Sequence, residues 1–272
     1  MDRSAIEALS ELTLRADGNR HLDTATPTVI LHGESGETIV SLEKFGAGRA
    51  RYRGHYTTTS LSSFIATVLD TTEEKSVGFI EPSAMMAVVY FNLGTAANPG
   101  HGDHLASLTL KKTAAYAALL NFVGRPHKQR ALAEWIEDWR EFLTPVSDGK
   151  PTGATIAKVI AAVRDITVTT AGEVNKVERD MGSSTSAMAR VDAQSQHVLP
   201  EGFLFETEPY AGLPKRVFEL RLGAITSDKD LALTLRIQQA ESQAEKIAQD
   251  FETVLTEGLG DKVTLSIGEF KL

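Results

Sequence analysis

The amino-acid sequence predicts an α+β fold, with mostly antiparallel sheet and several interspersed helices. Apolar segments flank the polar turn at residues 32–37, and another pair flanks residues 209–214, so each set predicts a β-hairpin. Apolar residues recur at helical spacing in the windows 60–69, 132–143 and 240–255. Hairpin-connected strands with a few helices between them are typical of α+β proteins, whereas a parallel sheet would need regular strand–helix alternation.

The first half of the chain is expected to hold three helices and six strands. Residues 2–16 predict a short amphipathic helix that ends at the stop signal Asp17-Gly18-Asn19, and a polar linker follows up to Pro27. Ser60 is the expected N-cap of the second helix. The other expected elements are a helix at 113–122 and strands at 28–31, 38–42, 50–56, 77–80, 85–92 and 105–110.

The second half predicts a helix after Pro126, followed by a loop at 144–153 with two prolines and two glycines. We take this loop as a subdomain boundary. The expected division is an N-terminal helix and linker at 1–27, an α+β subdomain at 28–145 and a second one at 154–272. Further expected elements are helices at 154–163 and 240–255, a polar loop at 182–186, and strands at 166–177, 203–208, 217–222, 231–237 and 263–267.

Composition narrows the classes of function. The 272 residues hold 28 Lys or Arg and 36 Asp or Glu, a net charge of −8 that disfavours duplex nucleic acid as a partner. The absence of cysteine excludes disulfides, thiolate metal sites and a cysteine nucleophile, and it fits a reducing cytosol. The longest apolar run has eight residues, at 84–91, and no apolar signal core follows the N-terminus, so we expect neither export nor a membrane partner.

Three blocks of residues resemble one protein family. They are RARYRG at 49–54 with SLSSF at 60–64; NLG at 92–94 with PGHGDH at 99–104 and LTLKKTAAY at 108–116; and LAEWIEDW at 132–139. Together they resemble the YfdQ-like family (domain of unknown function 2303). The resemblance is strongest over residues 41–143 and continues more weakly over 203–235. It implies a phage or prophage protein acting in the cytoplasm of a bacterial host cell, and it carries no established catalytic residues.

Arg49, Arg51 and Arg53 form the first candidate site. On a strand, alternate residues project from one face, so the three guanidinium groups would lie side by side and could hold phosphates through bidentate contacts. Tyr52 would project from the other face and could not stack on a base held there. The alternative interpretation is a solvated face whose arginines pair with carboxylates of this acidic chain.

His101, Asp103 and His104 form the second candidate site. Two imidazoles and a carboxylate within four residues could bind a divalent metal or transfer protons. Neighbouring strand residues point to opposite faces, so one metal would need another ligand, with His55 and Glu81 as candidates. The alternative is a tight turn whose polar side chains bond to the local backbone.

Trp135 and Trp139 lie four residues apart on one predicted helix face, which indicates packing in a core or at a subunit interface. Ile6 and Leu9 on the first helix are expected to pack in the same way, on a neighbouring subunit. No cofactor is expected, because no nucleophile elbow, dinucleotide fingerprint or helical pair of zinc histidines occurs.

Three hypotheses for the function follow. The first is a phage accessory protein, non-catalytic and self-assembling into a homo-oligomer, which would serve in host takeover as a shell, a scaffold or a trap for a host protein or signalling nucleotide. The second is a phosphate-directed binder of single-stranded nucleic acid or a signalling nucleotide, in early replication or defence evasion, with the three arginines as its site. The third is a metal-dependent hydrolase at His101, Asp103 and His104.

Overall fold

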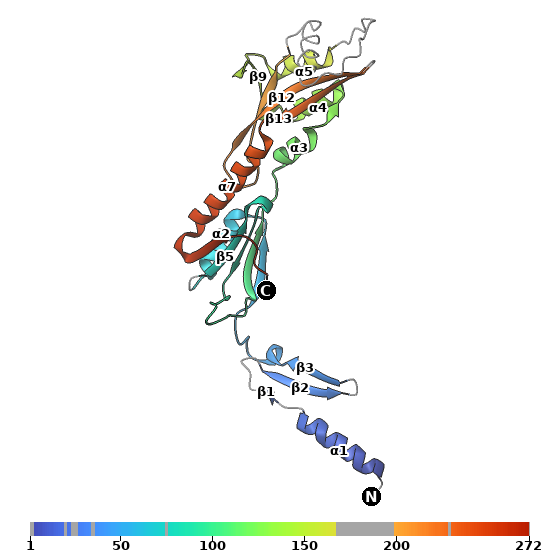
Figure 1. Cartoon of the computed structure of the whole chain (residues 1–272), viewed down its shortest axis with the longest axis vertical. Coiled ribbons are helices and arrows are strands. Elements are labelled where there is room, and N and C mark those ends of the chain that lie inside the picture. The colour runs from blue at the N-terminus through green and yellow to red at the C-terminus, as the bar shows by residue number, and fades with distance from the viewer. Residues whose placement is uncertain are drawn as a thin grey trace. The chain divides into compact units, whose positions relative to one another are not determined.

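The computed structural model describes residues 3–18, 21–22, 27–33, 36–73, 76–166, 199–227 and 230–271 (Figure 1). The chain forms two compact units, Met1–Gly54 and His55–Leu272. The predicted boundary at 144–153 does not coincide with this division. That segment carries strands β9 and β10, which belong to a sheet whose other strands come from both sides of it.

The first unit consists of a helix and a small antiparallel sheet. Helix α1 (Arg3–Gly18) agrees with the prediction, and β2 (Thr28–Gly33) pairs with β3 (Gly36–Ser41) as the predicted hairpin. The short strand β1 (His21–Leu22) pairs with β2 and completes the sheet order β1-β2-β3. A 3-10 turn, η1 (Glu43–Phe45), follows the hairpin.

The second unit contains a five-stranded sheet that takes a strand from the far end of the chain. The sheet order is β14 (Val263–Ile267), β5 (Ser76–Glu81), β6 (Met86–Tyr90), β7 (His104–Thr109) and β4 (Gly54–Thr58). Strands β5, β6 and β7 are antiparallel, whereas β14 lies parallel to β5. The predicted α+β class with mostly antiparallel sheet is therefore confirmed, although β14 and β5 are parallel.

A six-stranded antiparallel sheet forms the other half of the second unit. Its order is β10 (Lys150–Pro151), β9 (Leu143–Ser147), β11 (Gly202–Thr207), β12 (Arg216–Ser227), β13 (Asp230–Ile237) and β8 (Pro126–His127). Residues on its strands alternate between buried and exposed, because successive side chains point to opposite faces. The predicted strands at 203–208, 217–222 and 231–237 are confirmed. The predicted strand at 166–177 and the polar loop at 182–186 lie outside the described residues, apart from Ile166.

Helices cover the apolar faces of the second unit. They are α2 (Leu61–Thr71), α3 (Ala114–Phe122), α4 (Gln129–Asp138), α5 (Ile156–Arg164) and α7 (Ala240–Leu259), with the 3-10 turns η2 (Pro82–Ala84), η3 (Arg140–Phe142) and η4 (Gly260–Lys262). The predicted cap of α2 is present, because Ser60 Oγ accepts a hydrogen bond from the Ser63 amide at 3.3 Å. α4 packs against α5 and β13, whereas α7 packs against α2 and η2.

One apolar core runs through the second unit, from Leu61 on α2 to Val263 on β14. Phe203, Phe205 and Phe218 are its largest side chains on the six-stranded sheet, and each is at most 1% exposed. α7 is joined to this sheet by an ion pair between Arg216 on β12 and Asp250, whose Nη2 and Oδ2 atoms lie 2.7 Å apart. The core, as far as the described residues define it, includes no residue of the first unit.

Candidate functional site

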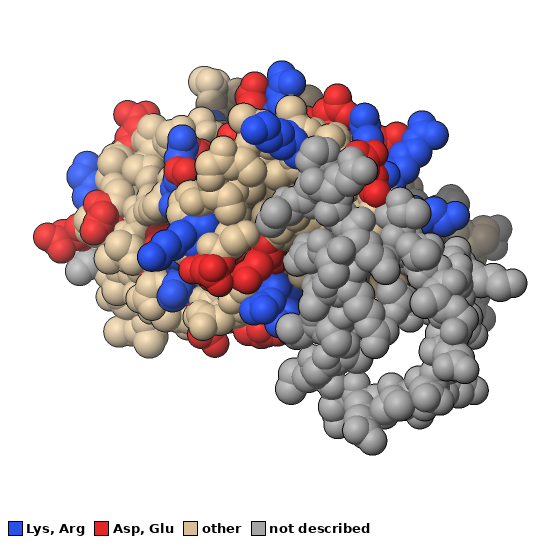
Figure 2. All heavy atoms as spheres, turned by 90° about the horizontal axis from the view of Figure 1, so that it is seen from above, with Lys and Arg blue, Asp and Glu red and all other residues tan. Residues whose placement is uncertain are grey.

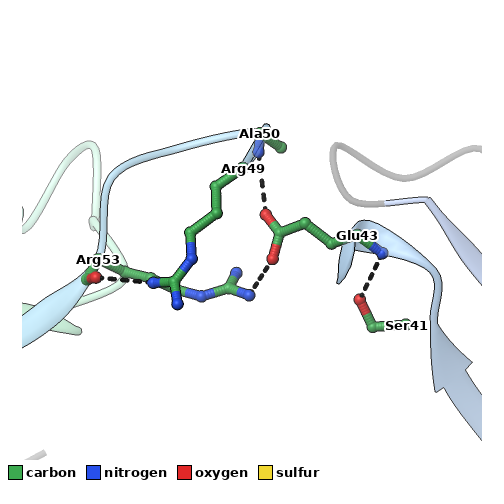
Figure 3. A network of polar contacts seen from close by, with 5 residues as sticks. All are labelled: Ser41, Glu43, Arg49, Ala50 and Arg53. Atoms are coloured by element: carbon green, nitrogen blue, oxygen red, sulfur yellow. Dashed lines mark hydrogen bonds and ion pairs between the residues drawn. The ribbon is translucent and has the colours of Figure 1, made fainter. Parts of the chain in front are cut away.

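The strand expected at 50–56 is wrong in its first half, because β4 begins only at Gly54. A buried carboxylate holds the preceding residues in a loop (Figure 3). The amide of Ala50 donates to Glu43 Oε1 at 2.9 Å, and the Arg53 guanidinium forms an ion pair with Glu43 Oε2. A backbone amide bonded to a carboxylate is not available to a neighbouring strand, so residues 46–53 fold around Glu43.

The three arginines of the first candidate site therefore do not share a strand face. Arg53 is committed to Glu43, and Arg49 Nη1 donates to the Arg53 carbonyl oxygen at 3.1 Å. Arg51 is half-buried and also has an interaction partner. A phosphate bound here would compete with Glu43, whose side chain is only 6% exposed. Phosphate binding by Arg49, Arg51 and Arg53 stays a prediction. Fewer of their N–H donors are available to a phosphate than the predicted strand would have offered.

His101, Asp103 and His104 lie at the end of a loop that the side chain of Asn92 organises. Asn92 Nδ2 donates to Asp103 Oδ1 at 2.9 Å, and Asn92 Oδ1 accepts from the His104 amide at 3.0 Å. His101 is exposed. The described residues contain no group of three or more His, Cys, Asp or Glu that could hold a metal ion, so metal binding here stays a prediction without geometric support.

The His104 ring packs on Phe91, with 4.5 Å between the ring centroids. Partial burial lowers the pKa of His104 below its ordinary value of 6.5, and the nearby Asp103 carboxylate offsets part of this shift. Burial of the ring thus favours the neutral form of the imidazole. The loop agrees with the alternative of a tight turn held by bonds between side chains and the local backbone, because the His104 amide donates to the Asn92 side chain.

Both tryptophans lie against the core of the second unit. Trp135 is 8% exposed and stacks between Phe122 and Phe205, with ring centroids 4.7 and 5.8 Å away. Trp139 is half-buried and packs on Phe142. Trp135 therefore lies in the core and Trp139 packs against it, which agrees with the first of the two predicted alternatives. Ile6 and Leu9 are 52% and 56% exposed, so they do not pack in the described core, and packing at a subunit interface stays a prediction for them.

A concave surface between α4 and α5 has a volume of about 430 Å³ and is lined by Gln129, Arg130, Glu134 and Arg164. Its arginines are already paired, because Arg130 Nε lies 2.7 Å from Glu134 Oε1 and Arg164 Nη2 lies 3.1 Å from Glu137 Oε2. The charges of this surface are therefore balanced internally. Its ionisable side chains pair with one another in the ion pairs given above.

Sequence reasoning missed a polar cluster on the five-stranded sheet. His55 Nε2 on β4 lies 2.6 Å from Ser107 Oγ on β7, and Thr57 Oγ1 lies 3.3 Å from the same hydroxyl. The hydrogen bonds of His55 go to Ser107 and Thr57, so no carboxylate of the described chain orients its ring as a general base would require. The two partners lie 52 positions apart in the sequence, which explains why no local motif revealed the pair.

Sequence reasoning also missed two arginines on the outer face of the six-stranded sheet. Arg221 on β12 lies directly opposite Arg236 on β13, and both are exposed. The alternation of residues 217–222 was visible in the sequence, but the pairing of β12 with β13 was not.

Over the described part of the face in Figure 2, basic and acidic side chains are interspersed and form no continuous basic stripe. An extended nucleic-acid groove therefore has no support on that face.

These observations define an α+β protein with a large helix-covered core. The chain belongs to the DUF2303 family, described as an uncharacterized conserved protein, whose model matches residues 3–270. No curated protein and no solved structure matches the chain. None of its described helices combines the length and apolar character needed to cross a membrane.

Proposed function

We propose that this protein is a non-catalytic accessory protein that assembles with copies of itself through its first unit. The observation that carries the proposal is the exposure of the apolar side chains in that unit. Ile6, Leu9 and Leu12 form one stripe on α1 and are 52%, 56% and 62% exposed. An amphipathic helix of this kind gains most of its stability from packing its apolar stripe, so the stripe requires a partner.

Other described apolar residues of the first unit are exposed as well, although α1 also contacts β2. Ile39 on β3, Phe45 in η1 and Tyr52 in the following loop are 70%, 74% and 76% exposed. Among the unit's residues whose burial is described, Glu43 is the one that is buried. Isolated exposed apolar residues are normal on a protein surface, but a unit whose described apolar side chains are at most half-buried has little core to stabilise it.

Charge favours a second copy as the partner. Residues 1–54 hold seven Lys or Arg and eight Asp or Glu, a net charge of −1, whereas the whole chain has −8. The first unit is therefore the part of this acidic chain that can approach its own copy with little repulsion. Most soluble oligomers are closed and symmetric, and a symmetric contact uses the same apolar patch on both copies.

The phage or prophage setting is a further part of the proposal and rests on the family resemblance. A self-assembling protein without a catalytic site would act there as a shell, a scaffold or a trap for a host factor, in the cytoplasm of the bacterial host.

Elemental analysis of the purified protein tests the separate metal hypothesis at His101, Asp103 and His104.

Self-assembly is tested by mass photometry and by size-exclusion chromatography with light scattering at micromolar concentrations. We expect the full chain to form a discrete oligomer and Leu9→Gln/Leu12→Gln to dissociate it. Ser4→Gln/Ser10→Gln, at exposed positions of α1 outside the apolar stripe, is the matched control and should leave the oligomer intact. A full chain that is monomeric at these concentrations would reject the proposal.

A further inference from the structure

The outer face of the six-stranded sheet carries two arginines side by side on adjacent strands. Arg221 on β12 pairs in register with Arg236 on β13. On its other side, Arg221 pairs with Gly202 on β11, where a Cβ would collide with the Leu220 carbonyl oxygen. The position beside Arg221 is thus a buried glycine, and no side chain there competes for the guanidinium group.

Neither arginine has a partner among the described residues, although the chain is acidic. No ion pair or hydrogen bond of either side chain occurs in the part of the chain that the structure describes. Arg216 on the same strand differs, because its guanidinium donates to Asp250 Oδ2 at 2.7 and 3.0 Å and to the Lys246 carbonyl oxygen at 3.0 Å. Glu219, which shares the outer face, lies outside ion-pair distance of both arginines.

A third donor lies next to the pair. Thr234 is two residues from Arg236 on the same face of β13, and its Oγ1 lies over Gly223, where a Cβ would be only 2.8 Å away. Thr234 is half-buried, and its hydroxyl has no hydrogen-bond partner within the described ranges. The hydroxyl can therefore donate to a ligand held by the two arginines.

Like charges directly opposite each other destabilise an antiparallel pair of strands. An anion between two guanidinium groups reverses this effect, because each group can donate two parallel hydrogen bonds to its oxygens. We propose that Arg221, Arg236 and Thr234 form a binding site for a phosphate monoester. This site is separate from the surface proposed for self-assembly, and either proposal can fail without the other.

The charges select a monoester among phosphate ligands. Two guanidinium groups supply two positive charges, and a phosphate monoester carries close to two negative charges at pH 7. A phosphodiester of a nucleic-acid backbone carries one. The same doubly charged phosphate group occurs in inorganic phosphate and in the monoester of a nucleotide, and the probes below separate these sources.

Isothermal titration calorimetry with the full chain tests the site, with orthophosphate, AMP and a single-stranded oligonucleotide without terminal phosphates as probes. We expect saturable binding of orthophosphate and AMP that weakens below about pH 6, where a monoester loses its second charge. Tighter binding of AMP identifies a nucleotide as the source, and equal binding identifies the phosphate group alone. Binding of the oligonucleotide alone would overturn the proposal.

Variants locate the binding. Arg221→Gln/Arg236→Gln should reduce the affinity at least tenfold, and Arg221→Lys/Arg236→Lys should reduce it less, because lysine keeps the charge but loses the fork of donors. Arg130→Gln/Arg140→Gln removes two exposed charges elsewhere and should leave the affinity unchanged. All these positions are exposed, so circular dichroism should show unchanged folding. Unchanged affinity in the Arg221→Gln/Arg236→Gln variant, or loss of binding in Arg49→Gln/Arg51→Gln/Arg53→Gln instead, would contradict the site.

Discussion

The two units of this chain use their apolar side chains in opposite ways. In the second unit, aromatic residues from a strand, a helix and a 3-10 turn stack on one another, and Phe205 is fully buried between Trp135 and Phe142. In the first unit, Phe45 is 74% exposed. We propose that the second unit holds its fold with its own contacts, whereas the first unit packs its apolar stripe against a copy of itself. This difference is the reason for proposing a self-assembly surface on the first unit.

The largest expected effect is the loss of Phe205 from the core. Phe205→Ala should lower the free energy of unfolding of the second unit by about 3–5 kcal/mol, because it removes a buried aromatic ring and leaves a cavity. Urea denaturation followed by tryptophan fluorescence measures this, since both tryptophans lie in that unit. Phe45→Ala is the control and should change the same transition by less than about 0.5 kcal/mol. Equal effects of the two substitutions would remove the contrast between the units.

The next effect concerns Glu43, the buried polar residue of the first unit. Glu43→Ala should free the amide of Ala50 and leave Arg53 without its carboxylate, which lowers the free energy of opening the loop by about 1–3 kcal/mol. Amide hydrogen exchange at Ala50, followed by NMR, reports this directly. Lys44→Ala, at an exposed neighbouring position, should leave the exchange rate unchanged. Unchanged exchange in Glu43→Ala would mean that other contacts hold the loop.

A smaller effect of opposite sign is expected at the arginine pair of the second unit. In phosphate-free buffer, Arg236→Gln should raise the free energy of unfolding by about 0.2–1 kcal/mol, because it relieves the repulsion by Arg221. Thermal unfolding at low salt measures the gain, which should shrink as salt screens the charges. A destabilised Arg236→Gln variant would show that this side chain has a structural role.

The smallest expected effect is a pH dependence at His104. Its pKa is lower in the folded chain than the ordinary value of 6.5, so the unfolded chain binds the proton more tightly. Stability should therefore fall as the pH drops through about 6.5 towards the lower folded pKa, and it should recover as the pH rises. Urea midpoints between pH 7.5 and pH 5 should show a shallower acid decline for His104→Gln than for the unchanged chain. Equal declines would contradict the shift.

Local patterns in the sequence predicted most of the elements that depend on neighbouring residues. The capped helix after Ser60, the hairpin of β2 and β3 and the final strand all follow from spacing and turn chemistry. The parallel pairing of β14 with β5 could not be predicted, because it joins residues that lie almost 190 positions apart. The division of the chain was missed for the same reason, since β9 pairs with β11 beyond the loop that indicated a boundary.

The candidate sites depended even more on long-range contacts. The prediction of a phosphate site at Arg49, Arg51 and Arg53 depended on their lying on one strand. The carboxylate of Glu43, ten residues before Arg53, instead holds that segment in a loop. Arg221 and Arg236 are separated by the turn of a hairpin, so their opposition depends on a register that composition does not reveal. The exposure of Ile6 and Leu9 likewise could not be predicted, because the sequence pattern of an amphipathic helix does not say whether its own unit supplies a core.

Hydrogen–deuterium exchange of α1 in the full chain, measured by mass spectrometry over a range of protein concentrations, tests the central claim most directly. If copies of the chain assemble through the stripe of Ile6, Leu9 and Leu12, the amides of α1 should become more protected as the concentration rises. Leu9→Gln/Leu12→Gln should abolish this dependence. Rapid exchange of α1 at every concentration in the unchanged chain would contradict the account.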